Sequence, residues 1–133
     1  MEKSEFQLQK EKHFKDFITY ATKFLNVKRT AISFKEYEGD ILGRHIRLAG
    51  LSMITVYCTG SFSMDADTIA HELVHQKQYE TTKLSTGLGG VDIWEEKDVS
   101  PSEYFSTPYE VQARKIAAYI LKKYKLQMIK ERL

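Results

Sequence analysis

A block of three short strand-like segments, at residues 30–37, 41–48 and 51–58, limits most strongly what this chain can fold into. The segments are rich in β-branched and aromatic residues, and glycine-containing turns rather than helices separate them. Strands that are grouped in this way, with helical patterns before and after them, are typical of α+β proteins. We therefore expect a small, mixed sheet that packs on helices.

The first helical pattern precedes this block, at residues 5–25. Its apolar side chains are spaced three or four positions apart, which gives one apolar face: Phe14, Phe17, Ile18, Ala21, Phe24 and Leu25. This helix is therefore expected to cover one face of the sheet.

Within the strand block, residues 38–40 form a turn signal, and the strand after this turn is expected to return along the first strand.

Two more helices are expected after the strands. The second helix is predicted to start near Ser63 or Asp65, either of which can cap free N–H groups, and to end near residue 79. Residues 81–107 contain several glycines and are expected to be mostly loop. Ser106 or Thr107 then precedes Pro108, which favours the first position of a last helix, at about 108–127. The sheet is thus expected to pack on three helices.

Length and composition exclude several classes of protein. A chain of 133 residues favours one domain, at 1–133, and its single cysteine, Cys58, excludes an intramolecular disulfide framework. The net charge of +2 gives no nucleic-acid signature, and no apolar run approaches the length of a membrane span. The first residues lack a secretory signal. We expect a cytoplasmic protein, most consistent with a monomer, that has neither nucleic-acid nor membrane partners.

The chemistry is concentrated in the sequence His-Glu-Leu-Val-His at residues 71–75. Residues four apart in a helix share a face, so His71 and His75 can direct imidazole nitrogens at one ion. Zn²⁺ prefers such ligands in a tetrahedral shell. Glu72 is rotated by about 100° around the helix axis, which places its carboxylate beside the metal, where it can activate a metal-bound water. The motif predicts one catalytic Zn²⁺ per chain.

A catalytic zinc needs a third protein ligand from elsewhere in the chain. His13 in the first helix, His45 in a strand and the acidic residues of the stretch 92–103 are candidates. We favour Glu110, because it lies in the first turn of an amphipathic helix. Alanines three and seven positions later share its face and allow that helix to approach the metal helix closely. Glu110 is the predicted third ligand.

The two segments together resemble the gluzincin branch of the zincin metallopeptidases. The resemblance rests on His-Glu-Leu-Val-His at 71–75 and on Pro-Tyr-Glu-Val-Gln-Ala at 108–113, which is similar to a segment of small, minigluzincin-type domains. It implies a zincin-like fold with His71, His75 and Glu110 as zinc ligands and Glu72 as the catalytic base. The metzincin pattern is excluded, because Gln78 and Thr81 stand where it has glycine and histidine.

The resemblance also implies where a substrate binds. The strand at 53–58 is implied to be the sheet edge that pairs with an extended peptide, so Thr55 and Tyr57 are predicted substrate-binding residues. Tyr104 and Tyr109 are candidates for stabilising the developing oxyanion. Cys58 is a less favoured candidate for a latent metal ligand.

These observations favour a zinc-dependent metallohydrolase, and most specifically a peptidase whose substrate is a peptide or a protein. A non-enzymatic binding or regulatory module with a structural or degenerate zinc site is the main alternative. A factor that cleaves one particular protein of a host is a further alternative. A solvated helix face explains the basic residues after residue 110 most simply, and a docking surface for an acidic partner is the alternative. By analogy with small gluzincin-like domains, the last helix is also a candidate lid or autoinhibitory segment.

Overall fold

The computed structural model describes residues 2–48, 50–81, 84–86, 92–94, 97–98 and 107–132. The fold is α+β, as predicted, with three helices and a small mixed sheet. Its elements follow one another along the chain as α1 (Glu5–Leu25), β1 (Ile32–Glu36), β2 (Gly43–Leu48), β3 (Leu51–Cys58), α2 (Phe62–Glu80), β4 (Leu84–Thr86), β5 (Asp92–Trp94), β6 (Lys97–Asp98) and α3 (Pro108–Glu131).

The main sheet has the strand order β1-β3-β2. β3 pairs with β1 in parallel and with β2 in antiparallel orientation, so the prediction of a mixed sheet is confirmed. Gly50, with a φ of 78°, lies in the tight turn that joins β2 to β3. The predicted return of β2 along β1 is wrong, because β3 lies between these two strands.

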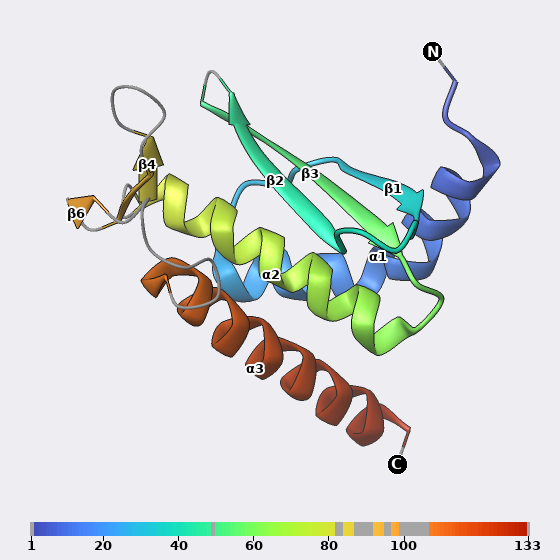
Figure 1. The fold of residues 1–133 in the computed structure, drawn as a ribbon. Helices are drawn as coiled ribbons and strands as arrows, with labels where there is room; N and C mark the ends of the chain where they lie inside the picture. The colour runs from blue at the N-terminus through green and yellow to red at the C-terminus, as the bar shows by residue number, and fades with distance from the viewer. Residues whose placement is uncertain are drawn as a thin grey trace.

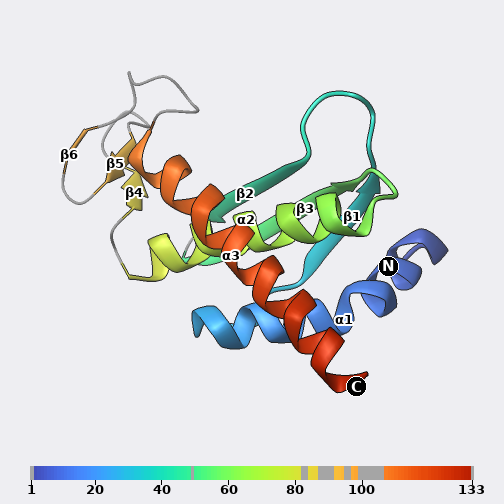
Figure 2. The ribbon, with the colours of Figure 1, turned by 90° about the horizontal axis from the view of Figure 1, so that it is seen from below.

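Helix α2 lies between the sheet and α3 (Figure 1). It packs against β2 and β3 on one side and along α3 on the other, while α1 contacts α2 and β1. Seen from below, α3 crosses in front of both other helices (Figure 2). The chain therefore places α2, which carries the histidine motif, at the centre of the fold.

One apolar core joins these layers. Phe14 and Phe17 of α1, Ile54 and Val56 of β3 and Leu73 of α2 are almost completely buried in it. In β3 the buried residues alternate with more exposed ones, as expected for a sheet that packs on helices through one face. Helix α3 adds small side chains to the core, which permits close packing against α2.

The helix boundaries confirm part of the prediction. Helix α1 covers residues 5–25 as expected, and α3 begins at Pro108 after the N-cap Thr107 but continues beyond the predicted end, to Glu131. Helix α2 begins at Phe62, next to the predicted Ser63, but the predicted capping residues are wrong: its N-cap is Ser61, whose Oγ accepts a hydrogen bond from the N–H of Met64. Ser63 and Asp65 lie inside the helix, because the capping signal two residues earlier is the one used.

Three short strands lie in the stretch that was predicted to be mostly loop. β5 pairs with β4 and with β6, both in antiparallel orientation, in a second small sheet. The prediction of loop is therefore wrong for residues 84–86, 92–94 and 97–98. Two- and three-residue strands give too short a pattern to recognise in sequence.

Candidate metal centre

His71 and His75 lie one turn apart on α2 and direct their rings at the same point. Their Nε2 atoms are 3.2 Å apart. Ligands of a tetrahedral zinc bound at about 2.0–2.1 Å lie about 3.3 Å from one another. The spacing of the two imidazole nitrogens is therefore close to the spacing that one such ion requires.

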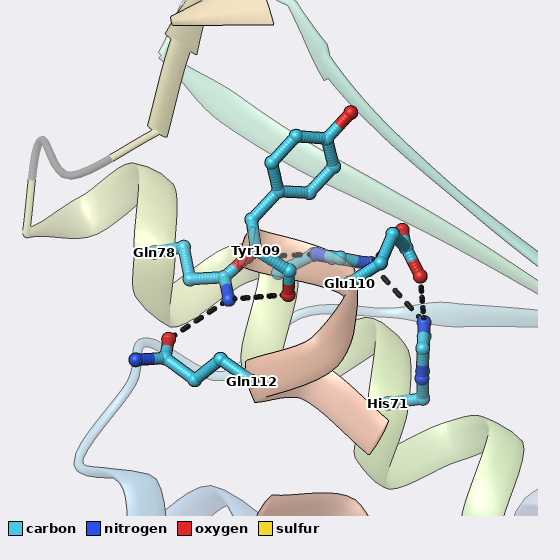
Figure 3. A network of polar contacts seen from close by, with 6 residues as sticks. His71, Gln78, Tyr109, Glu110 and Gln112 are labelled. Atoms are coloured by element: carbon cyan, nitrogen blue, oxygen red, sulfur yellow. Dashed lines mark hydrogen bonds and ion pairs between the residues drawn. The ribbon is translucent and has the colours of Figure 1, made fainter. Parts of the chain in front are cut away.

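Glu110 reaches the same point from α3 (Figure 3). Its Oε2 lies 3.0 Å from Nε2 of His71 and its Oε1 lies 2.8 Å from Nε2 of His75. Burial would raise the pKa of Glu110, but the hydrogen bonds from the two histidines outweigh this effect and lower the pKa to about 2. The predicted third ligand is thus an ionised carboxylate in contact with both histidines.

Glu72 differs from Glu110 in its hydrogen bonding. It is 6% exposed, and its Oε2 is buried without a hydrogen-bond partner among the described residues. Burial raises the pKa of Glu72, and the nearby imidazoles of His75 and His71 oppose this shift. Ligand atoms of His71, Glu72 and His75 all lie within 4.8 Å of one another, so this group could hold a metal ion.

A cleft of about 480 Å³ opens beside these side chains. Its walls come from the segment that leads into β2, from α2 and from α3: Ile41, Leu42, Gly43, Asp67, Thr68 and Arg114. His71, Glu72 and Glu110 line it as well. The cluster is therefore accessible from one side, as a site that acts on an external ligand requires.

Gly43, which the sequence analysis did not single out, sets the distance between β2 and α2. A Cβ at this position would lie 2.6 Å from Cγ2 of Thr68 and 3.3 Å from Cγ of Glu72. Only glycine allows the strand to approach the helix so closely. In the sequence, a glycine at the start of a predicted strand indicates a close approach of another segment. It does not indicate which helix residue makes that approach.

Gln78, also missed, lies behind the histidines. Its Oε1 is 2.8 Å from Nδ1 of His75, on the side of the ring opposite the metal site. Metal-binding histidines commonly donate their second ring N–H in this way. The signal in the sequence was the spacing of three residues from His75, which places both side chains on one helix face.

The other candidate ligands lie outside the cluster. The exposed ring of His13 packs edge-on against those of Phe14 and Phe62. The ring of His45 stacks on that of Tyr79, and its Nε2 is 2.8 Å from Oγ of Ser52. Neither histidine belongs to the group of ligand atoms found in the described part of the chain.

Cys58 is buried at the end of β3 and is not in that group. Burial, with a contribution from the charge of Asp65, raises the pKa of its thiol to about 11. The acidic side chains of 92–103 lie outside the residues whose side chains the structure describes, and their role as ligands stays a prediction.

The implied substrate-binding edge is wrong. Thr55 and Tyr57 belong to β3, which is the central strand and uses its backbone groups on both sides. Their side chains alternate with the buried Ile54, Val56 and Cys58. β2 pairs only with β3 in the main sheet, so it is an edge strand. It also packs on α2 and lines the cleft beside the metal cluster.

The two tyrosines have different outcomes. The ring of Tyr109 lies 6.0 Å from that of His75, centroid to centroid, and its backbone C=O accepts a hydrogen bond from Gln78. Its role in stabilising an oxyanion stays a prediction. Tyr104 lies outside the described residues.

Comparison with protein-family models, with curated proteins and with solved structures finds no match to this chain. A function must therefore be inferred from the geometry and chemistry of the cluster.

Proposed function

We propose that this protein is a zinc-dependent metallohydrolase of zincin-like type, and that it cleaves peptide bonds. One Zn²⁺ per chain is held by His71, His75 and Glu110, and Glu72 acts as the general base. The observation that carries the proposal is the buried Oε2 of Glu72, which has no hydrogen-bond partner in the described structure, on a carboxylate with a ligand oxygen within 4.8 Å of the ligand nitrogens of His71 and His75. A buried carboxylate oxygen without a partner is costly, so a ligand or water is expected there.

The donor atoms fit zinc. Two imidazole nitrogens and one carboxylate form a three-ligand set that catalytic zinc sites use, with one position left for substrate or water. When bound, zinc lowers the pKa of a coordinated water and polarises a carbonyl group. Glu72 then accepts the proton of the attacking water and transfers it to the leaving amine, which is the usual work of a general acid–base residue.

An extended peptide is the substrate that the surroundings favour. β2 is an edge strand beside the cleft, so its outer backbone N–H and C=O groups can pair with an added strand. Ile41 and Leu42 are partly exposed in the cleft wall and provide an apolar contact for substrate side chains. This arrangement replaces the implied pairing at β3 with pairing at β2.

The first test is the metal content of the purified protein. We expect about one zinc per chain, and we expect His71→Ala and Glu110→Ala to lose most of it. His13→Ala is the matched control, because His13 packs on Phe14 and Phe62 and is not in the group of ligand atoms found in the described part of the chain. Equal zinc in the His71→Ala variant and the wild type would contradict the proposed site.

The second test separates the base from the ligands. Glu72→Gln is expected to keep its zinc and to lower kcat/KM for peptide hydrolysis by about 10²–10⁴-fold. Full activity in this variant rules out the assigned role of Glu72.

A structural zinc site is the alternative, and the proximity of Glu72 to both histidines favours it, since a fourth protein ligand would close the shell. The Glu72→Gln variant discriminates between the two. If its affinity for zinc falls as strongly as that of Glu110→Gln, Glu72 is a ligand and the protein is a binding or regulatory module. Unchanged affinity supports the hydrolase.

No helix within the described ranges is long and apolar enough to cross a membrane.

A further inference from the structure

Gln78 is a fully buried amide at the junction of α2 and α3 (Figure 3). Its Nε2 lies 3.0 Å from the backbone oxygen of Tyr109 and 2.9 Å from Oε1 of Gln112, both in α3. Its Oε1 lies 2.8 Å from Nδ1 of His75. One side chain thus connects a residue of the candidate metal centre to the neighbouring helix.

The chemistry of these partners fixes the orientation of the amide. A backbone carbonyl oxygen can only accept hydrogen bonds, so the group that faces the C=O of Tyr109 must be the NH₂ of Gln78. The opposite orientation would leave two oxygens in contact and the buried carbonyl without a donor, which costs about 1–3 kcal/mol. The oxygen of Gln78 therefore faces His75.

The orientation of the amide in turn decides the protonation of the ring. An amide oxygen accepts, so Nδ1 of His75 must carry a proton and donate it to Gln78. Nε2 then faces the point where His71 and Glu110 converge, and a metal ion bound there would replace the proton that Nε2 donates to Glu110. The second ring nitrogen of a histidine determines which nitrogen is available to a metal in this way.

We propose that Gln78 is a positioning residue for the metal centre. It holds His75 with the proton on Nδ1 and the lone pair of Nε2 directed at the ion. It also fastens the first turn of α3, because Tyr109 is the residue before Glu110. The inference deepens the proposed function and rests on it for the role of the ion, but the position of the proton on His75 can be tested without any metal.

Gln76 is the matched control. It is also a fully buried glutamine of α2, and its Nε2 donates to the backbone oxygen of Lys28 at 2.8 Å and to Oε2 of Glu80 at 2.7 Å. It fastens α2 to the segment after α1 and has no contact with either histidine in its hydrogen bonds. Methionine keeps most of the volume of either glutamine, so Gln78→Met and Gln76→Met remove comparable hydrogen bonds at two different places.

The first measurement is imidazole NMR of the metal-free protein. We expect a slowly exchanging Nδ1–H on His75 in the wild type and in Gln76→Met, because the oxygen of Gln78 accepts its hydrogen bond, and we expect this protection to be lost in Gln78→Met. A rapidly exchanging or absent Nδ1–H in the wild type overturns the inference, and so does equal protection in Gln78→Met. The wild-type spectrum decides the matter even if a variant does not fold.

The second measurement is zinc affinity by competition with a chelator. Gln78→Met should bind zinc about 10–100-fold more weakly than Gln76→Met, the usual loss when a partner of a metal-bound histidine is removed. Equal affinities in the two variants overturn the positioning role. If the wild type binds no zinc at all, the proposed function fails, while the NMR result still decides whether Gln78 fixes the proton on His75.

Discussion

Two buried carboxylates of α2, Asp65 and Glu72, lie two turns apart and have opposite surroundings. The oxygens of Asp65 accept hydrogen bonds from the backbone N–H and the hydroxyl of Thr59, each at 2.9 Å, and from the N–H of Gly60 at 3.3 Å. Oε2 of Glu72 has no partner in the part of the chain that the structure describes. Asp65 stabilises the turn before the helix, whereas Glu72 keeps capacity for a ligand.

The contrast gives a structural criterion that separates a stabilising acid from a candidate functional one. Both side chains are almost fully buried, so burial does not separate them. The difference is whether groups of the protein donate hydrogen bonds to both carboxylate oxygens. A fold that retains an unsatisfied oxygen beside two histidines gives up some stability at that position, as functional sites commonly do.

The largest expected effect concerns Asp65. Asp65→Ala should lower the free energy of unfolding by about 2–3 kcal/mol, because hydrogen bonds to a charged acceptor are lost and two N–H groups lose their partner. Urea denaturation of the metal-free protein measures this loss. A decrease below about 0.5 kcal/mol, typical of neutral surface positions, would show that Asp65 is not a stabilising acid.

The second effect concerns the strand beside Glu72. Gly43→Ala should destabilise the protein by about 1–3 kcal/mol, because the new methyl group overlaps Cγ2 of Thr68. Thr68→Ser removes that methyl group and keeps the hydroxyl that donates to the backbone oxygen of Met64. The double variant should therefore regain most of the loss in urea denaturation. Strictly additive effects would indicate that the two residues do not press on each other.

The third effect has the opposite sign. Glu72→Gln should raise the free energy of unfolding of the metal-free protein by on the order of 1 kcal/mol, because a neutral amide costs less to bury than an unpartnered carboxylate. Thermal or urea unfolding in the presence of a chelator measures the gain. A loss of stability comparable to that of Asp65→Ala would remove the distinction between the two acids.

The smallest effect concerns Cys58. Because burial and the charge of Asp65 raise the pKa of its thiol to about 11, the thiol should react slowly with a disulfide reagent at neutral pH and faster as pH rises toward that value. Asp65→Asn should lower this pKa only slightly, by less than the one unit that corresponds to a tenfold change. The pH profile of labelling measures both. A neutral-pH rate equal to that of free cysteine would contradict the raised pKa.

Much of the architecture could be predicted from local patterns. The range of α1, the three strand segments and the proline at the start of α3 each follow from residues close together in the chain. The helical spacing of His71 and His75 is equally local, and the structure brings Glu110 to them. Alternation and periodicity in the sequence indicate which face of an element is buried, and these predictions depend on such local patterns alone.

The remainder depends on contacts between distant segments. The pattern of β1 resembles that of β2, so it does not reveal that β1 pairs with β3 in parallel, at Ile32 with Ile54. The same holds for Gly43 and Thr68, which meet across the strand–helix packing, and for Gln78, whose partner Tyr109 lies in another helix. Ser61 and Ser63 are equivalent as capping signals, and only packing selects the first.

The origin of the three ligands on two helices has one more consequence. Both histidines belong to α2, and Glu110 belongs to α3, about 35 residues after His75. An ion that binds all three ties together two remote points of the chain, as a cross-link does. By loop-closure entropy, such a link across about 35 residues is worth about 4 kcal/mol against the unfolded chain. The ion of the proposed reaction would thus also stabilise the packing of α3 against α2.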